Sequence, residues 1–162
     1  ASVPRGSGIV VNSNDKVEIF DNDIVDSKTA NIIISSYYST NYYNAQGVAP
    51  DYNPYPKGIF IYGNRFKGGG ESPDQRFAAL RDAVYGASGR FPDIFWDGYY
   101  DAKAMVDGKL PPEQRLCIQN GDVGVLNADF PNGSKHPSTD TEPYRCSLAK
   151  LPPVQLDPAP KL

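Results

Sequence analysis

The sequence predicts a mostly β protein in which short parallel strands stack as a solenoid. Residues 17–24 (Val-Glu-Ile-Phe-Asp-Asn-Asp-Ile) return as residues 59–66 (Ile-Phe-Ile-Tyr-Gly-Asn-Arg-Phe), and residues 8–11 (Gly-Ile-Val-Val) return as residues 31–34 (Asn-Ile-Ile-Ile). A short spacing of this kind is typical of stacked repeats. The apolar runs are short, β-branched and punctuated by Asn, Asp and Gly, which favours strands over helices. Each pass of the chain would then bury its inward face by stacking on its neighbours.

These phrases carry a family resemblance. Gly-Ile-Val-Val followed by Val-x-Ile-x-x-Asn-x-Ile resembles the repeat of right-handed parallel β-helices with a pectate-lyase-like fold, over residues 6–70 and again at 116–129. The order of the longer stretches is similar to the C-terminal part of an uncharacterised group of secreted bacterial β-helix proteins. The resemblance implies a right-handed parallel β-helix, and it implies no particular activity.

Length and composition set broad limits. With 162 residues the chain is expected to form a single domain, 1–162, or the C-terminal fragment of a longer one. The formal net charge of −3 and the lack of a basic cluster argue against nucleic-acid binding. No apolar run approaches the roughly 18 residues of a membrane span. The first strands would leave an open N-terminal edge, which we expect missing coils or a protein partner to cover.

Four regions follow in order. The repeat coils are expected at residues 8–66, with Val17 and Ile19 pointing inward and Asn22 stacking on Asn64 in a ladder of side chains. A helical and irregular insertion is expected at residues 71–114, the last strands at 115–130 and an extended proline-rich tail at 131–162. In the insertion, Ser72 is the expected N-cap of an amphipathic helix that Gly86 ends.

Aromatic residues supply the candidate ligand site. A tyrosine-rich loop at residues 37–57 interrupts the repeats, and a loop of this length is usually functional or packs on itself. Tyrosine offers an apolar face and a hydroxyl, as a sugar-binding platform requires. The candidates are Tyr37, Tyr38, Tyr42, Tyr43 and Trp96. The alternative interpretation is that the tyrosines fill their own loop and that Trp96 anchors the insertion on the core.

The two cysteines, Cys117 and Cys146, fit no zinc, haem or redox spacing. We predict a disulfide that joins the tail to the last strands, although two free thiols are the alternative. A disulfide indicates an oxidising compartment, here the periplasm or the extracellular space.

Catalytic and metal-binding residues are sparse. Asp21 and Asp23 flank Asn22 and are expected to point outward, where two acids could serve glycoside hydrolysis or bind calcium. Arg65 aligns with Asp23, and lyases of this fold class use an arginine base and calcium-binding acids. Solvated turn acids and a simple ion pair are the alternatives. His136 is the single histidine, so we expect no multi-histidine metal site.

Two functions remain open. The first is a non-catalytic secreted module that acts as a binding or assembly surface, with polysaccharide among its candidate partners, alone or as a subunit or fragment of a larger protein. The second is the C-terminal part of a polysaccharide lyase or glycoside hydrolase whose catalytic coils lie upstream. The lack of a convincing acid–base pair favours the first.

Overall fold

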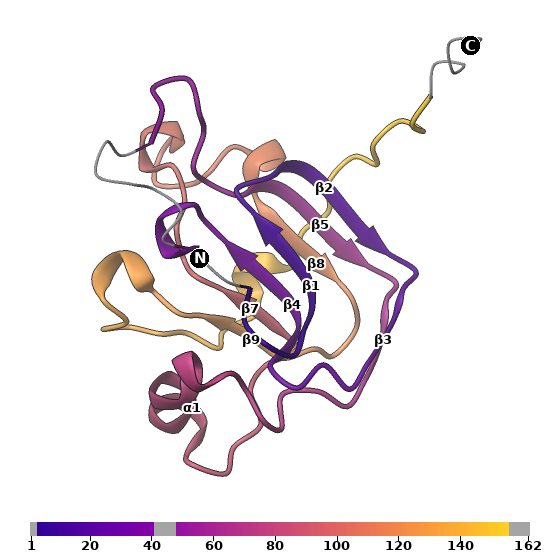
Figure 1. Ribbon diagram of the computed structural model, residues 1–162. Helices are drawn as coiled ribbons and strands as arrows, with labels where there is room; N and C mark the ends of the chain where they lie inside the picture. Colours follow the sequence, from indigo (N-terminus) through magenta and orange to yellow (C-terminus); the bar gives the residue numbers. More distant parts are fainter. Residues whose placement is uncertain (1–2, 41–47, 156–162) are drawn as a thin grey trace, which may run out of the picture.

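Three short parallel sheets form the body of the protein in the computed structural model, which describes residues 3–40 and 48–155 (Figure 1). Their strands are β1 (Ser7–Asn12), β2 (Asp15–Phe20), β3 (Asp23–Val25), β4 (Ala30–Ser35), β5 (Lys57–Tyr62), β6 (Arg65–Lys67), β7 (Ile94–Trp96), β8 (Leu116–Gln119) and β9 (Val125–Asn127). One α-helix, α1 (Ala78–Tyr85), accompanies them. The short 3-10 helices are η1 (Tyr38–Thr40), η2 (Gln75–Phe77), η3 (Ala102–Ala104), η4 (Pro112–Gln114), η5 (Phe130–Asn132) and η6 (Glu142–Tyr144).

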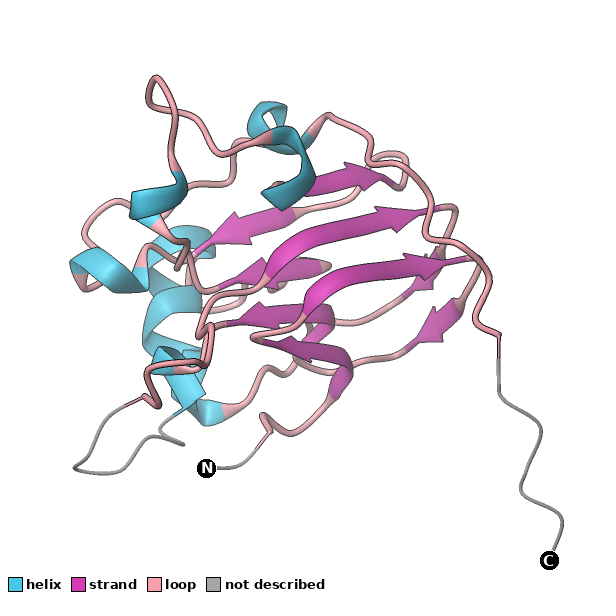
Figure 2. Ribbon diagram, turned by 90° about the horizontal axis from the view of Figure 1, so that it is seen from above, coloured by secondary structure: helices cyan, strands magenta, loops and turns pink. Residues whose placement is uncertain are grey.

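The strand orders are β1-β4-β7-β9, β2-β5-β8 and β3-β6, and every pair in them is parallel. The two repeated phrases pair in the predicted register. Ile9 lies opposite Ile32, Val17 opposite Ile59 and Ile24 opposite Phe66. Figure 2 shows most of the short helices gathered at one side of the strands, with the C-terminal tail on the opposite side.

The predicted right-handed parallel β-helix is wrong. The described residues form three short parallel sheets with one α-helix, and no solenoid is detected in them. A physical reason lies in the spacing of the pairs in the first sheet. Ile9 pairs with Ile32, Ile32 with Ile94 and Ile94 with Val125, so the separation changes from 23 to 62 to 31 residues. The early repeat therefore does not continue, because long insertions separate the later strands.

Two apolar clusters stabilise the sheets. The first contains the inward side chains of all three sheets, among them Ile24, Ile32, Ile61 and Ile118. The second lies on the other face of β4 and β7, where Ile33 and Phe95 contact Phe77 and Phe91. Because β4 contributes to both clusters, all six of its residues are buried.

The amphipathic helix covers the second cluster, as its pattern predicts. Leu80 and Val84 of α1 pack there beside Phe77, which precedes the helix. The expected N-cap at Ser72 is displaced, since the Asp74 carboxylate caps η2 by accepting from the Arg76 N–H. Gly86 ends α1 as expected, with a φ of 78° that favours glycine.

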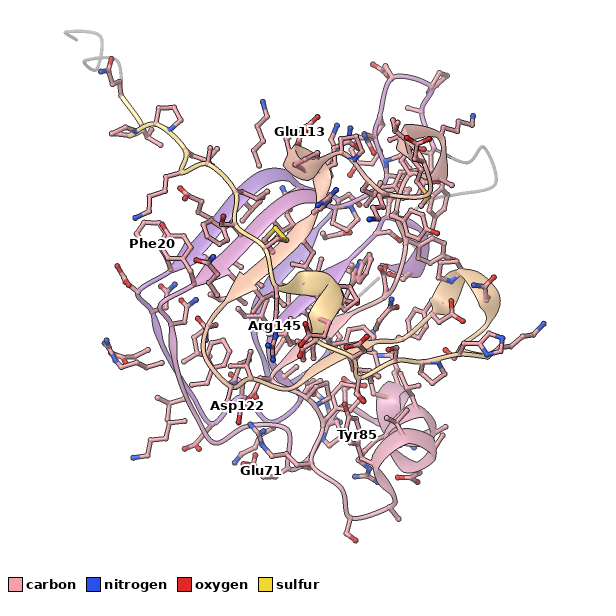
Figure 3. The ribbon with its side chains drawn as sticks, turned by 180° about the vertical axis from the view of Figure 1, so that it is seen from behind. Phe20, Glu71, Tyr85, Glu113, Asp122 and Arg145 are labelled. Atoms are coloured by element: carbon pink, nitrogen blue, oxygen red, sulfur yellow. A yellow bond between two sulfur atoms is a disulfide. The ribbon has the colours of Figure 1, made fainter. Side chains whose placement is uncertain are left out.

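The predicted disulfide between Cys117 and Cys146 is confirmed. It fixes the tail to β8, and the tail then crosses the outer face of the β2-β5-β8 sheet (Figure 3). There the Lys150 ammonium lies 5.1 Å from the centre of the Tyr62 ring, and the Leu151 N–H donates to Glu18. A formed disulfide fits an oxidising compartment. No helix in the described ranges has the length and apolar character of a membrane span.

The predicted pairing of Asn22 with Asn64 extends to a third member, Asn120. The Asn22 side chain and its backbone N–H both donate to Asn64 Oδ1, at 2.9 and 3.1 Å. Asn64 donates to Asn120 Oδ1 in the same way, at 3.0 and 2.7 Å. This column of asparagines, the Asn ladder, holds three successive turns of the chain in register.

Replacing Asn64 by alanine should destabilise the fold by about 2–3 kcal/mol, because Asn22, Asn120 and the buried Ile19 carbonyl each lose a hydrogen-bond partner. The free energy of unfolding in urea measures the effect. Asn132→Ala is the matched control, because Asn132 is exposed and donates only to Asp129 within one turn. Equal stability of the two variants would contradict a supporting role for the Asn ladder.

Removing the disulfide as Cys117→Ala with Cys146→Ala should cost about 3–4 kcal/mol, because the unfolded chain regains the freedom of the closed loop. Thermal unfolding of the variant, compared with the native protein with and without reductant, measures this loss. A variant as stable as the oxidised protein would show that the tail needs no covalent tie.

Candidate functional site: a tyrosine cluster

A buried aspartate organises the end of the first sheet. Asp97 follows β7 directly, and its side chain is fully buried. Its carboxylate accepts from the backbone N–H groups of Ser36 and Tyr99, and from the Ser39 hydroxyl at 2.6 Å. Burial raises the pKa of Asp97, and these hydrogen bonds oppose that rise. Asp97 therefore joins the segment after β4 to the segment after β7.

Tyrosine rings gather around this junction. Tyr37 meets Tyr52 edge-on, with ring centres 5.3 Å apart. Tyr38 packs against Tyr55 at 5.6 Å and against Tyr99 at 5.5 Å. We call these five residues the tyrosine cluster. Burial and the neighbouring Tyr38 hydroxyl raise the pKa of Tyr55.

Backbone hydrogen bonds hold the segments that carry the rings. The Tyr37 N–H donates to the Pro54 carbonyl at 2.9 Å, and the Ser13 hydroxyl donates to the same oxygen. The Tyr55 N–H donates to the Asn53 side chain. The tyrosine cluster is thus tied both to Asp97 and to the turn between β1 and β2.

The tyrosine cluster borders an open depression of about 460 Å³, lined by Tyr37, Val48, Ala49, Asp51 and Tyr52. Tyr52 is 43% exposed, so a ligand in the depression can reach its ring. Of the predicted ligand-binding residues, Tyr37 and Tyr38 belong to the tyrosine cluster. Tyr42 and Tyr43 lie outside the described residues.

Trp96 lies apart from the tyrosine cluster. Its side chain packs against the first apolar cluster, and its ring meets Tyr144 edge-on at 5.9 Å. This position corresponds to the anchoring alternative for Trp96. Tyr52 and Tyr55 lie in the predicted tyrosine-rich loop without being among its named candidates, and Tyr99 and Asp97 were not predicted as members of the site. Ser36 and Asp97 each directly follow one of two paired strands, but the pairing of β4 with β7 is not visible in the sequence.

The candidate catalytic residues form an exposed ion pair. The Arg65 guanidinium donates twice to the Asp23 carboxylate, at 2.5 and 2.7 Å, and both side chains are more than half exposed. The hydrogen bond from Arg65 lowers the pKa of Asp23, and the same contact raises the pKa of Arg65. Asp21 lies at a left-handed turn with a φ of 53°.

Within residues 3–40 and 48–155, no three His, Cys, Asp or Glu side chains are grouped so as to hold a metal ion. His136 lies in an exposed loop, where its backbone N–H donates to Asp129.

Comparisons with family models, with curated proteins and with solved structures gave no match for this chain.

Replacing Asp97 by asparagine should destabilise the protein by about 2–3 kcal/mol. The N–H groups of Ser36 and Tyr99 approach different oxygens, so an amide would turn its own NH₂ toward one of these buried donors. Urea unfolding gives the loss, and near-ultraviolet circular dichroism reports the order of the tyrosine rings. Asp101→Asn is the control, because Asp101 accepts a single hydrogen bond at the start of η3. Equal losses in the two variants would contradict the organising role of Asp97.

Proposed function

We propose that this protein is a non-catalytic binding module of the periplasm or extracellular space, and that the tyrosine cluster stacks against a polysaccharide. The gathering of tyrosine rings over the Asp97 junction is the observation that carries the proposal. Tyrosine rings supply apolar faces for sugar rings, and their hydroxyls bond sugar hydroxyls. The disulfide supports the compartment, because such bonds persist in oxidising surroundings.

The segments that carry the tyrosine rings are held in place, which favours binding. A binding site loses less entropy when its rings are held before the ligand arrives. Asp97 fixes the two segments that carry Tyr37, Tyr38 and Tyr99 by hydrogen bonds to their backbone and to Ser39. Tyr52 remains accessible at the rim of the depression.

An enzymatic role has weaker support. A glycosidase needs an acid and a second carboxylate at the scissile bond, and a lyase of the expected kind needs an arginine base. Asp23 and Arg65 neutralise each other in an exposed pair. We therefore place the function in binding.

Affinity electrophoresis in native gels tests the proposal, with xylan, glucomannan and polygalacturonate as separate probes. At least one should retard the protein. Tyr52→Ala should weaken binding about fivefold, from the loss of one aromatic contact, whereas Tyr52→Phe keeps the ring and should lose less. Phe20→Ala is the control, because Phe20 is an exposed aromatic residue on a different sheet.

Retardation by none of the three polymers would contradict a polysaccharide ligand. Unchanged retardation of Tyr52→Ala, or an equal loss in Phe20→Ala, would contradict the placement of the site at the tyrosine cluster.

A further inference from the structure

The three sheets share an unpaired side. β1, β2 and β3 each stand at the end of the strand order of their sheet. Half of the backbone N–H and C=O groups of an edge strand point away from its one neighbour and can pair with another chain. Because β1, β2 and β3 follow one another in the chain, one additional pass of polypeptide could meet all three.

Rows of side chains stop at this edge. The Phe20 ring stacks on Tyr62, with centres 5.1 Å apart and planes 2° from parallel. Phe20 is 45% exposed and lies at the rim of its sheet (Figure 3). In the Asn ladder each asparagine oxygen accepts two hydrogen bonds from the preceding asparagine. Asn22 is the first member, so in the described structure its oxygen lacks those two donors.

The charges along the edge are mainly acidic. Asp15, Glu18, Asp21, Asp23 and Asp26 lie on this first pass of the chain, together with Lys16 and Lys28. In β5 and β6, which pair with β2 and β3 and form the second pass of the chain, basic residues stand opposite two of these acids. Lys57 lies 3.4 Å from Asp15, and Arg65 forms the ion pair with Asp23. The second pass therefore shows which charges fit beside this strand.

At the opposite end, the outer edge of the first sheet is covered by the chain itself. Asn127 of β9 exchanges two backbone hydrogen bonds with Ser138, and Tyr144 of η6 is buried in the first apolar cluster. A second copy could not place this end on the open edge without displacing its own residues 138–146. Two open edges facing each other would bring Asp15 and Asp23 of one copy, each already paired with a base of its own chain, against the same pairs of the other copy, so neither edge offers the other an unpaired base. Neither arrangement adds a base beside the acids of this edge, so we look to a different polypeptide.

We propose that the edge of β2 and β3 is a docking surface for a parallel β-strand of a separate polypeptide, with a basic residue opposite Asp15 and Asp23, an aromatic residue opposite Phe20 and an asparagine opposite Asn22. The incoming asparagine donates its backbone and side-chain N–H groups to Asn22 Oδ1. The incoming ring stacks on Phe20, and the strand gains backbone hydrogen bonds along β2. The tyrosine cluster takes no part in this contact.

A peptide with the sequence of residues 57–67 is a suitable probe, since it carries all of these features in the required register. Fluorescence anisotropy of the labelled peptide, titrated with the native protein, measures binding. A peptide in which Lys57 and Arg65 are replaced by glutamate should bind at least tenfold more weakly. Phe20→Ala in the protein should weaken binding about fivefold. Tyr52→Ala is the matched protein control and should bind as the native protein does.

Asp23→Asn provides a second protein variant that preserves the shape of the side chain and should weaken peptide binding severalfold. No binding of the native peptide, or equal binding of the charge-reversed peptide, would overturn the proposal. So would sedimentation that shows a dimer lost in Phe20→Ala, because a second copy would then be the occupant. Polysaccharide binding has separate variants, so failure of either proposal leaves the other intact.

Discussion

The Asn ladder is the interaction on which the arrangement of the sheets depends. Parallel strands that come from distant parts of the chain need a feature that fixes their register, because a slip of one residue would turn the inward isoleucines outward. Asn22, Asn64 and Asn120 provide it through paired hydrogen bonds to side chain and backbone. With that turn fixed, β2 and β3 meet β5 and β6 in a single register, and Ile24, Ile61 and Ile118 reach the same apolar cluster.

Asp97 performs a similar task at another edge of the structure, at the cost of burying a charge-bearing group. Three donors offset that cost, and the segments that supply them are the ones that carry the tyrosine rings. The fold and the candidate site are therefore coupled. The paired β4 and β7 bring Ser36 and Asp97 together, and that contact positions Tyr37, Tyr38 and Tyr99.

Local patterns predicted the pairing of β1 with β4, of β2 with β5 and of β3 with β6, because the paired phrases repeat in the chain. They also predicted the Asn22–Asn64 pair and the disulfide, whereas Asn120 was not predicted as a member of the Asn ladder. The overall architecture was mispredicted as a regular β-helix. Its later pairs cross insertions of variable length, and a single sequence shows no period there. The grouping of Tyr38, Tyr55 and Tyr99 was also hidden, since strand pairing decides which loops meet. Trp96 resembled a ligand platform in sequence, although its place on β7 directs it to the core.

Residues 138–146 cover the outer edge of β9, and this limits where a further strand can pair with the first sheet. A molecule with two complementary ends adds copies head to tail without limit, as fibres do. Here residues 138–146 cover the outer edge of β9. Ser138 pairs with Asn127, Tyr144 is buried in the first apolar cluster, and the disulfide from Cys146 to Cys117 holds this segment in place. Within the described residues, the outer edge of β9 is therefore closed to a further strand, whereas β1, β2 and β3 keep an unpaired side. If a strand docks on that side, the covered edge at β9 keeps the first sheet from growing further in the opposite direction.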